Sequence, residues 1–141
     1  MKLSTIIAGL MLSSAPLMCP GLARAHHSFA MFDSTRLVVL HGTLLSFTYL
    51  SPHSWISVEV PPGTGVPDGR WDVEGHSPEG LTAMGISRDS FKRGDKLTIG
   101  IRPLKDNRRG GSLVFLVDAS GKVYGAKPED LGLKSAELKP R

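Results

Sequence analysis

The chain has 141 residues, of which 40% are hydrophobic, and a formal net charge of +4. This length suits one domain with a modest core. Its basic residues are scattered, apart from a turn at 105–109 and the tail at 134–141, so we do not expect a nucleic-acid-binding protein. No apolar run approaches the roughly 20 residues that a membrane-spanning helix requires.

Residues 1–25 have the three parts of a secretory signal peptide. Lys2 provides the charged start, an apolar run follows, and Ala-Arg-Ala at 23–25 matches an A-x-A cleavage site. A lipoprotein signal at Cys19 is not favoured, because the residue before it is not small and a proline follows it. Cleavage after residue 25 would remove the chain's only cysteine, lower the net charge from +4 to +2, and make His26 the first residue. We therefore predict a periplasmic or secreted protein without a disulfide.

Three strands are expected in the first half of the mature chain. Residues 36–49 are rich in β-branched and aromatic side chains, with Gly42 where a bulge or sharp bend would fall. In residues 55–60 apolar and polar side chains alternate, which predicts one buried and one wet face. A loop rich in proline and glycine then leads to a short strand at 70–74, and these two strands should form a hairpin.

A short helix follows the third strand. Ser77 is a plausible N-cap with proline after it, and Gly85 ends the helix. Residues 96–102 alternate clearly and predict a fourth strand, and residues 122–124 predict a short return strand near the end of the domain.

Residues 112–118 are the fifth predicted strand, in which Leu113, Phe115 and Val117 should form one core face. The order of strand, strand, strand, helix, strand, strand matches a five-stranded barrel of the oligonucleotide/oligosaccharide-binding (OB) type, with a small open sandwich as the alternative. The predicted fold class is therefore all-β with one short helix, in a domain at 26–125 that is followed by a loosely ordered polar tail at 126–141.

Several short motifs are spread over nearly the whole mature chain: His26-His27-Ser28-Phe29, Phe32-Asp33, Leu40-His41-Gly42-Thr43, Pro52-His53-Ser54-Trp55-Ile56, Trp71-Asp72-Val73-Glu74-Gly75 and Gly94-Asp95-Lys96-Leu97. Together they resemble an exported bacterial family of unknown function, family 6152. The resemblance implies an exported protein with a small β-barrel-like domain, and it implies no activity. The chain departs from the family pattern at Ser51, where asparagine is expected, and at 100–103, where a Gly-His-Pro stretch is expected.

Histidine is the best metal donor available to an exported chain without cysteine. If His26 is the first residue, its amine and its ring nitrogen can chelate one ion together, because the amine titrates at about 7.7 to 8.0 in peptides. His27 or His53 would complete a three-nitrogen set suited to copper, with Glu74 as a weaker ligand. We therefore predict a copper site at these four residues.

A second interpretation of the histidines remains open. Adjacent residues on a strand point to opposite faces, so His26 and His27 could be a polar terminus that binds nothing. His53 would then only form a hydrogen bond within its loop. His41 is predicted to be structural, and His76 to be an exposed loop residue.

Tyr49, Trp55 and Trp71 are the candidates for a ligand-binding aromatic platform on the barrel, where this architecture binds ligands. The alternative is that both tryptophans are partly buried wall residues. No nucleophile elbow, phosphate-binding loop or HExxH motif occurs, so we expect a binding protein rather than an enzyme. The two hypotheses are a metal carrier or sensor, and a module that binds a glycan, a peptide or a protein.

Overall fold

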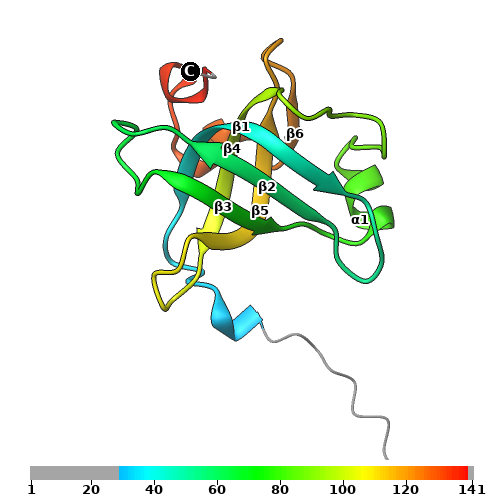
Figure 1. Cartoon of the computed structure of the whole chain (residues 1–141), viewed down its shortest axis with the longest axis horizontal. Helices are drawn as coiled ribbons and strands as arrows, with labels where there is room; N and C mark the ends of the chain where they lie inside the picture. The colour runs from blue at the N-terminus through cyan, green and yellow to red at the C-terminus, as the bar shows by residue number, and fades with distance from the viewer. Residues whose placement is uncertain (1–28, 140–141) are drawn as a thin grey trace, which may run out of the picture.

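The computed structural model describes residues 29–139 and shows a small, mostly β protein (Figure 1). One short α-helix lies between the third and fourth strands, and three 3-10 turns lie outside the barrel strands. Within residues 29–139, no helix is long and apolar enough to cross a membrane. The elements are η1 (Phe29–Met31), β1 (Val38–Thr48), β2 (Trp55–Val60), β3 (Gly69–Glu74), α1 (Pro78–Ala83), β4 (Lys96–Pro103), β5 (Gly110–Val117), β6 (Val123–Gly125), η2 (Pro128–Leu131) and η3 (Ser135–Leu138).

The sheet closes on itself. Its strand order is β3-β2-β1-β4-β5-β6, and an additional parallel pairing joins β3 to β5. The first half of β1 pairs with β4 and its second half pairs with β2, so the longest strand takes part in both halves of the barrel. The predicted five-stranded OB-like barrel, with its helix between strands three and four, is confirmed.

Gly42 lies where β1 passes from one partner strand to the other. A Cβ atom on Gly42 would be 2.9 Å from the carbonyl oxygen of Glu59 on β2, so only glycine allows this close approach. The predicted bulge is close by rather than at Gly42, because the register shift lies between Leu44 and Ser46. The long strand coils there around the barrel.

The barrel interior is filled by apolar side chains from every barrel strand, and α1 covers one end of it. Leu81 of α1 is fully buried against this core. The helix starts as predicted, with Ser77 Oγ accepting a hydrogen bond from the Gly80 amide at 3.3 Å and Pro78 in the first turn. The core cluster includes Leu40, Leu44, Ile56, Val58, Trp71, Val73, Leu97, Ile99, Ile101, Leu113 and Leu116.

The predicted core face of β5 was wrong in one respect. Gly100 pairs with Phe115 but Ile101 pairs with Leu113, so β5 has a bulge at the residue between Leu113 and Phe115. One extra residue reverses the side-chain alternation. Leu113 and Leu116 therefore belong to the barrel core, whereas Phe115 and Val117 belong to a second apolar cluster. A Cβ on Gly100 would overlap the Phe115 ring, which explains the glycine opposite it.

The C-terminal segment covers this second cluster. The sequence predicts a loosely ordered tail at 126–141, but its described part, to residue 139, forms η2 and η3 and buries Leu138 at 8% exposure against Phe115 and Val117. Leu131 and Leu133 pack there as well. The reason is the β5 bulge, which turns two large apolar side chains outward and thereby provides a surface for the tail's leucines.

Candidate functional site

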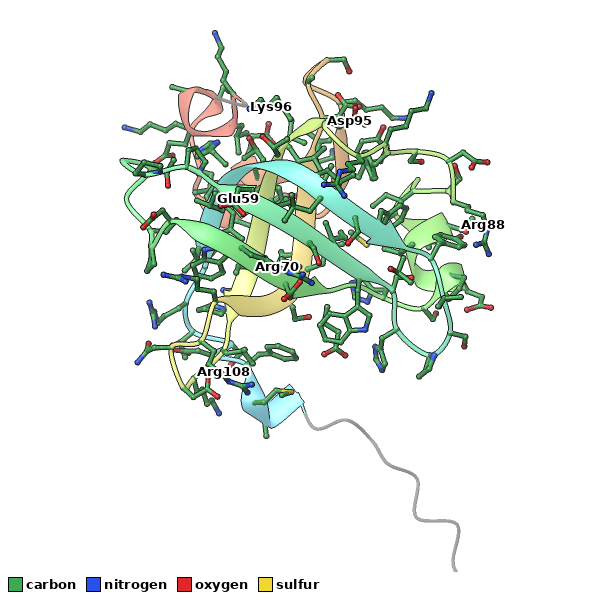
Figure 2. The ribbon with its side chains drawn as sticks, viewed as in Figure 1. Glu59, Arg70, Arg88, Asp95, Lys96 and Arg108 are labelled. Carbon is green, nitrogen blue, oxygen red and sulfur yellow. The ribbon has the colours of Figure 1, made fainter. Side chains whose placement is uncertain are left out.

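A groove of about 300 Å³ lies on the outer face of the barrel, at the side formed by β2 and β3. We call it the Trp55 groove. It is lined by Met31 of η1, Trp55 of β2, Asp72 and Glu74 of β3, and Arg109 of the β4–β5 loop, among other residues. Figure 2 shows side chains on the outer face of β2 and β3, with Arg108 of the same loop beside η1.

Strand alternation directs these side chains outward. On β2 the neighbouring Ile56 is buried in the core, so Trp55 points to the opposite face and remains 44% exposed. The antiparallel register pairs Trp55 with Glu74 and Ser57 with Asp72. The groove therefore has an aromatic ring from β2 on one wall and two carboxylates from the adjacent β3 on its floor.

Asp72 is held by two neighbours through a single carboxylate oxygen. Arg70 donates to Asp72 Oδ1 from Nε at 3.0 Å and from Nη2 at 2.8 Å, and Ser57 Oγ donates to the same atom. Burial alone would raise the pKa of Asp72, but hydrogen bonds from Arg70 and Ser57, with the charge of Arg70, lower it below its ordinary value. Among the described residues, Asp72 Oδ2 accepts no hydrogen bond.

Glu74 is held in the same way by His53. The distance from His53 Nδ1 to Glu74 Oε1 is 3.0 Å, and the Glu74 side chain is only 15% exposed. The loop that carries His53 is fixed to the end of the hairpin, because Ser54 donates its amide to the His76 carbonyl at 3.1 Å and accepts from the Gly75 amide at 2.8 Å. Within the described part of the chain, Glu74 Oε2 has no hydrogen-bond partner.

Arg109 lines the groove, and no acidic side chain among residues 29–139 forms an ion pair with its guanidinium. The guanidinium lies beside Gly69, where an added Cβ would be 3.6 Å from Nη1. Its backbone carbonyl accepts from the Asp72 amide at 3.2 Å, which ties the loop to β3. Arg108 differs, because its Nε donates to Asp106 Oδ2 at 2.7 Å.

The predicted metal ligands are only partly within the described chain. His26 and His27 lie outside the described residues, whereas His53 and Glu74 are in contact. Residues 29–139 contain no group of three or more His, Cys, Asp or Glu side chains that could hold a metal ion. His41 is 6% exposed, with Nδ1 3.1 Å from Thr98 Oγ1, and His76 is exposed.

The three predicted aromatic residues do not share one surface. Trp55 lines the groove, but Trp71 is 5% exposed, belongs to the core, and donates from Nε1 to the Pro67 carbonyl at 2.8 Å. Tyr49 lies at α1, where its hydroxyl donates to the Pro78 carbonyl at 2.8 Å. Alternation of β3 places Trp71 on the opposite side of the strand from Asp72.

Of the residues that line the groove, only Trp55 and Glu74 were predicted as site residues, and Met31, Asp72 and Arg109 were not. The signal for Arg109 was the basic turn between the last two predicted barrel strands. In an OB-type barrel the loop between strands four and five flanks the face formed by strands two and three. The parallel pairing of Asp72 with Gly110 brings this loop to the groove.

The fold and the groove define a class: a small closed β-barrel of the OB type with an open polar and aromatic face. Residues 16–113 match a family of unknown function, DUF6152, and the chain belongs to this family. The family resemblance found in the sequence motifs is thereby confirmed. Searches of curated proteins and of solved structures gave no significant match.

Proposed function

We propose that this chain is an exported binding protein that holds a small ligand in the Trp55 groove. The observation that carries the proposal is the position of Trp55, which is 44% exposed on the wall of a groove whose floor carries Asp72 and Glu74. This face of the barrel is where OB-type folds bind oligonucleotides and oligosaccharides.

The exposure of Trp55 contrasts with the burial of Trp71 on the adjacent strand. A tryptophan buries about 150–250 Å² when it is enclosed, so an indole left open forgoes much of the stabilisation it could provide. Trp71 is enclosed at 5% exposure and its indole N–H has a backbone partner. Trp55 is therefore suited to contact a ligand rather than to fill the core.

Calorimetry on the secreted protein tests the proposal with three probes: a neutral trisaccharide, a trigalacturonate and an acidic tripeptide. We expect saturable binding of one of these probes, and a loss of at least tenfold in affinity in Trp55→Ala. Val123→Ala is the matched control, because Val123 is also an exposed apolar residue but lies on β6. Absence of binding for every probe, or equal affinity in Trp55→Ala, would contradict the proposal.

A second candidate function is copper binding through His26, His27 and His53 with Glu74. The observation that favours it is the carboxylate–histidine contact of 3.0 Å between Glu74 and His53, since metal-bound histidines are commonly oriented by a carboxylate. The described chain begins at Phe29 in η1, and Met31 of η1 lines the same groove as Glu74. His27 comes two residues before Phe29 in the sequence, and two residues span at most about 7 Å.

Copper binding is tested on the secreted form by intact mass and by Cu(II) calorimetry. A mass that corresponds to a His26 start, with one-to-one binding, is the expected result. His26→Ala, a one-residue extension of the N-terminus, and His53→Ala should each weaken Cu(II) binding at least tenfold, while the exposed His76→Ala serves as the control. A different start, or affinity that His53→Ala leaves unchanged, would rule out this candidate.

A further inference from the structure

We infer that the ligand of the Trp55 groove is an acidic saccharide whose sugar ring stacks on Trp55 and whose carboxylate pairs with Arg109. The inference rests on the proposed function and specifies its ligand class. It follows from four properties of the groove: its volume, its exposed indole, its two acceptor oxygens, and the Arg109 guanidinium, which forms no ion pair among residues 29–139.

The volume and the indole set the size and shape of the ligand. A groove of about 300 Å³ is at the small end of the range for ligand pockets, about 300–1,000 Å³, and therefore suits one or two sugar rings rather than a long chain. Trp55 presents a flat apolar surface from one wall. The C–H face of a pyranose ring is likewise flat and apolar, whereas its edge carries hydroxyl groups.

The groove floor selects for hydroxyl donors. Asp72 Oδ2 and Glu74 Oε2 face no donor among the described residues, while the other oxygen of each carboxylate is held by Arg70 or by His53. The carboxylates are thus oriented before a ligand arrives. Ionised carboxylate oxygens only accept hydrogen bonds, and bonds from hydroxyl groups to them are among the stronger hydrogen bonds in proteins.

The charges at the two ends of the groove differ. The Asp72 carboxylate forms an ion pair with Arg70, and the Arg108 guanidinium forms an ion pair with Asp106. Arg109, beside Gly69 at the start of β3, has no acidic partner among residues 29–139.

The pairing of β2 with β3 determines which end of a bound ligand would lie near each groove residue. Glu74 is at the far end of β3 from Arg109, where it pairs across the strands with Trp55. A uronate disaccharide with one ring on Trp55 would direct hydroxyl groups toward the β3 carboxylates and the carboxylate of its second ring toward the guanidinium. Arginine binds a carboxylate through two parallel charge-assisted hydrogen bonds, whereas a neutral sugar offers it only uncharged hydroxyl acceptors.

A matched pair of ligands tests the inference on the secreted protein: trigalacturonate and its fully methyl-esterified form. The two have the same rings and hydroxyl groups and differ in the carboxylate charge. We expect calorimetry to show at least tenfold tighter binding of the acid. Arg109→Gln should remove most of this preference, whereas Arg93→Gln, an exposed arginine in the turn before β4, should keep it.

Trp55→Ala separates this inference from the proposed function. If the ester binds as tightly as the acid and Trp55→Ala abolishes both, the groove is a binding site but its ligand is not acidic, and the inference is overturned alone. If only the acidic tripeptide binds, the saccharide class is wrong. If neither sugar binds and no probe depends on Trp55, the inference and the proposed function both fail.

Discussion

The two outer faces of this barrel differ in what covers them. The outer face at β5 carries Phe115 and Val117, and the C-terminal segment covers them with Leu138. The outer face at β2 and β3 carries Trp55 and the two β3 carboxylates, and no segment within residues 29–139 covers the groove over them. The chain thus buries the outward apolar side chains of β5 and leaves Trp55 44% exposed on the other face, and we propose that this difference separates stability from binding.

The largest effect is expected on the covered face. Phe115 is fully buried between Gly100 and the tail, so Phe115→Ala should remove about 3–5 kcal/mol from the free energy of unfolding, as large-to-small core changes do. Urea denaturation followed by circular dichroism measures the loss. A change below about 1 kcal/mol would show that the outward cluster does not contribute as a core.

A smaller effect on stability is expected when one buried side chain of the C-terminal segment is shortened. Leu138→Ala should destabilise the protein by about 2 kcal/mol, the low end for buried leucine, because Leu138 lies at the rim of the cluster with 8% exposure. Hydrogen exchange should show increased opening of residues 128–138 with little change in the barrel strands. Uniform loss of protection throughout the barrel would instead make the tail part of one cooperative unit.

The open face should respond to acid through Asp72. Its folded-state pKa lies below its ordinary value of 3.8, so its stabilising contribution is present above that pH and is lost as the pH falls through the folded value. Because the side chains of Asp72 and Arg70 are 45% and 63% exposed, the contribution should be under about 1 kcal/mol. Urea midpoints measured from pH 7 to pH 3 should therefore fall slightly less for Asp72→Asn than for the native chain. Parallel curves would show that the pair contributes nothing.

The smallest effect on stability is expected at Trp55. Trp55→Ala removes an exposed ring, so the free energy of unfolding should change by less than about 0.5 kcal/mol although ligand affinity is lost. Trp71→Ala is the contrasting variant, because Trp71 is enclosed in the core and should lose several kcal/mol, about 3–5. Equal destabilisation by both changes would remove the distinction between the two tryptophans.

The barrel could be predicted because each strand has its own local pattern. Alternation at 55–60 and 96–102, the capped helix start at Ser77, and the glycine in the long first strand all agree with one topology. The β5 bulge could not be predicted, because a register shift depends on how β5 pairs with β4 and leaves no local signal in an apolar strand.

The candidate site was predictable to a similar extent. Alternation places Trp55, Asp72 and Glu74 on outward faces, and their pairing follows from the hairpin. That Arg109 joins them depends on the parallel contact between β3 and β5, which brings together residues far apart in the sequence. The contact between His53 and Glu74 likewise depends on how the loop before β2 folds over the end of the hairpin.

The proposed binding site is tested most directly by an NMR titration that follows the indole N–H signals of Trp55 and Trp71 in the same sample. As trigalacturonate is added to the purified protein, we expect a saturable shift of the Trp55 signal, with the Trp71 signal unchanged because that ring is enclosed in the core. A Trp55 signal that stays in place while the ligand binds, or equal shifts of both signals, would contradict the claim that the open face is the binding site.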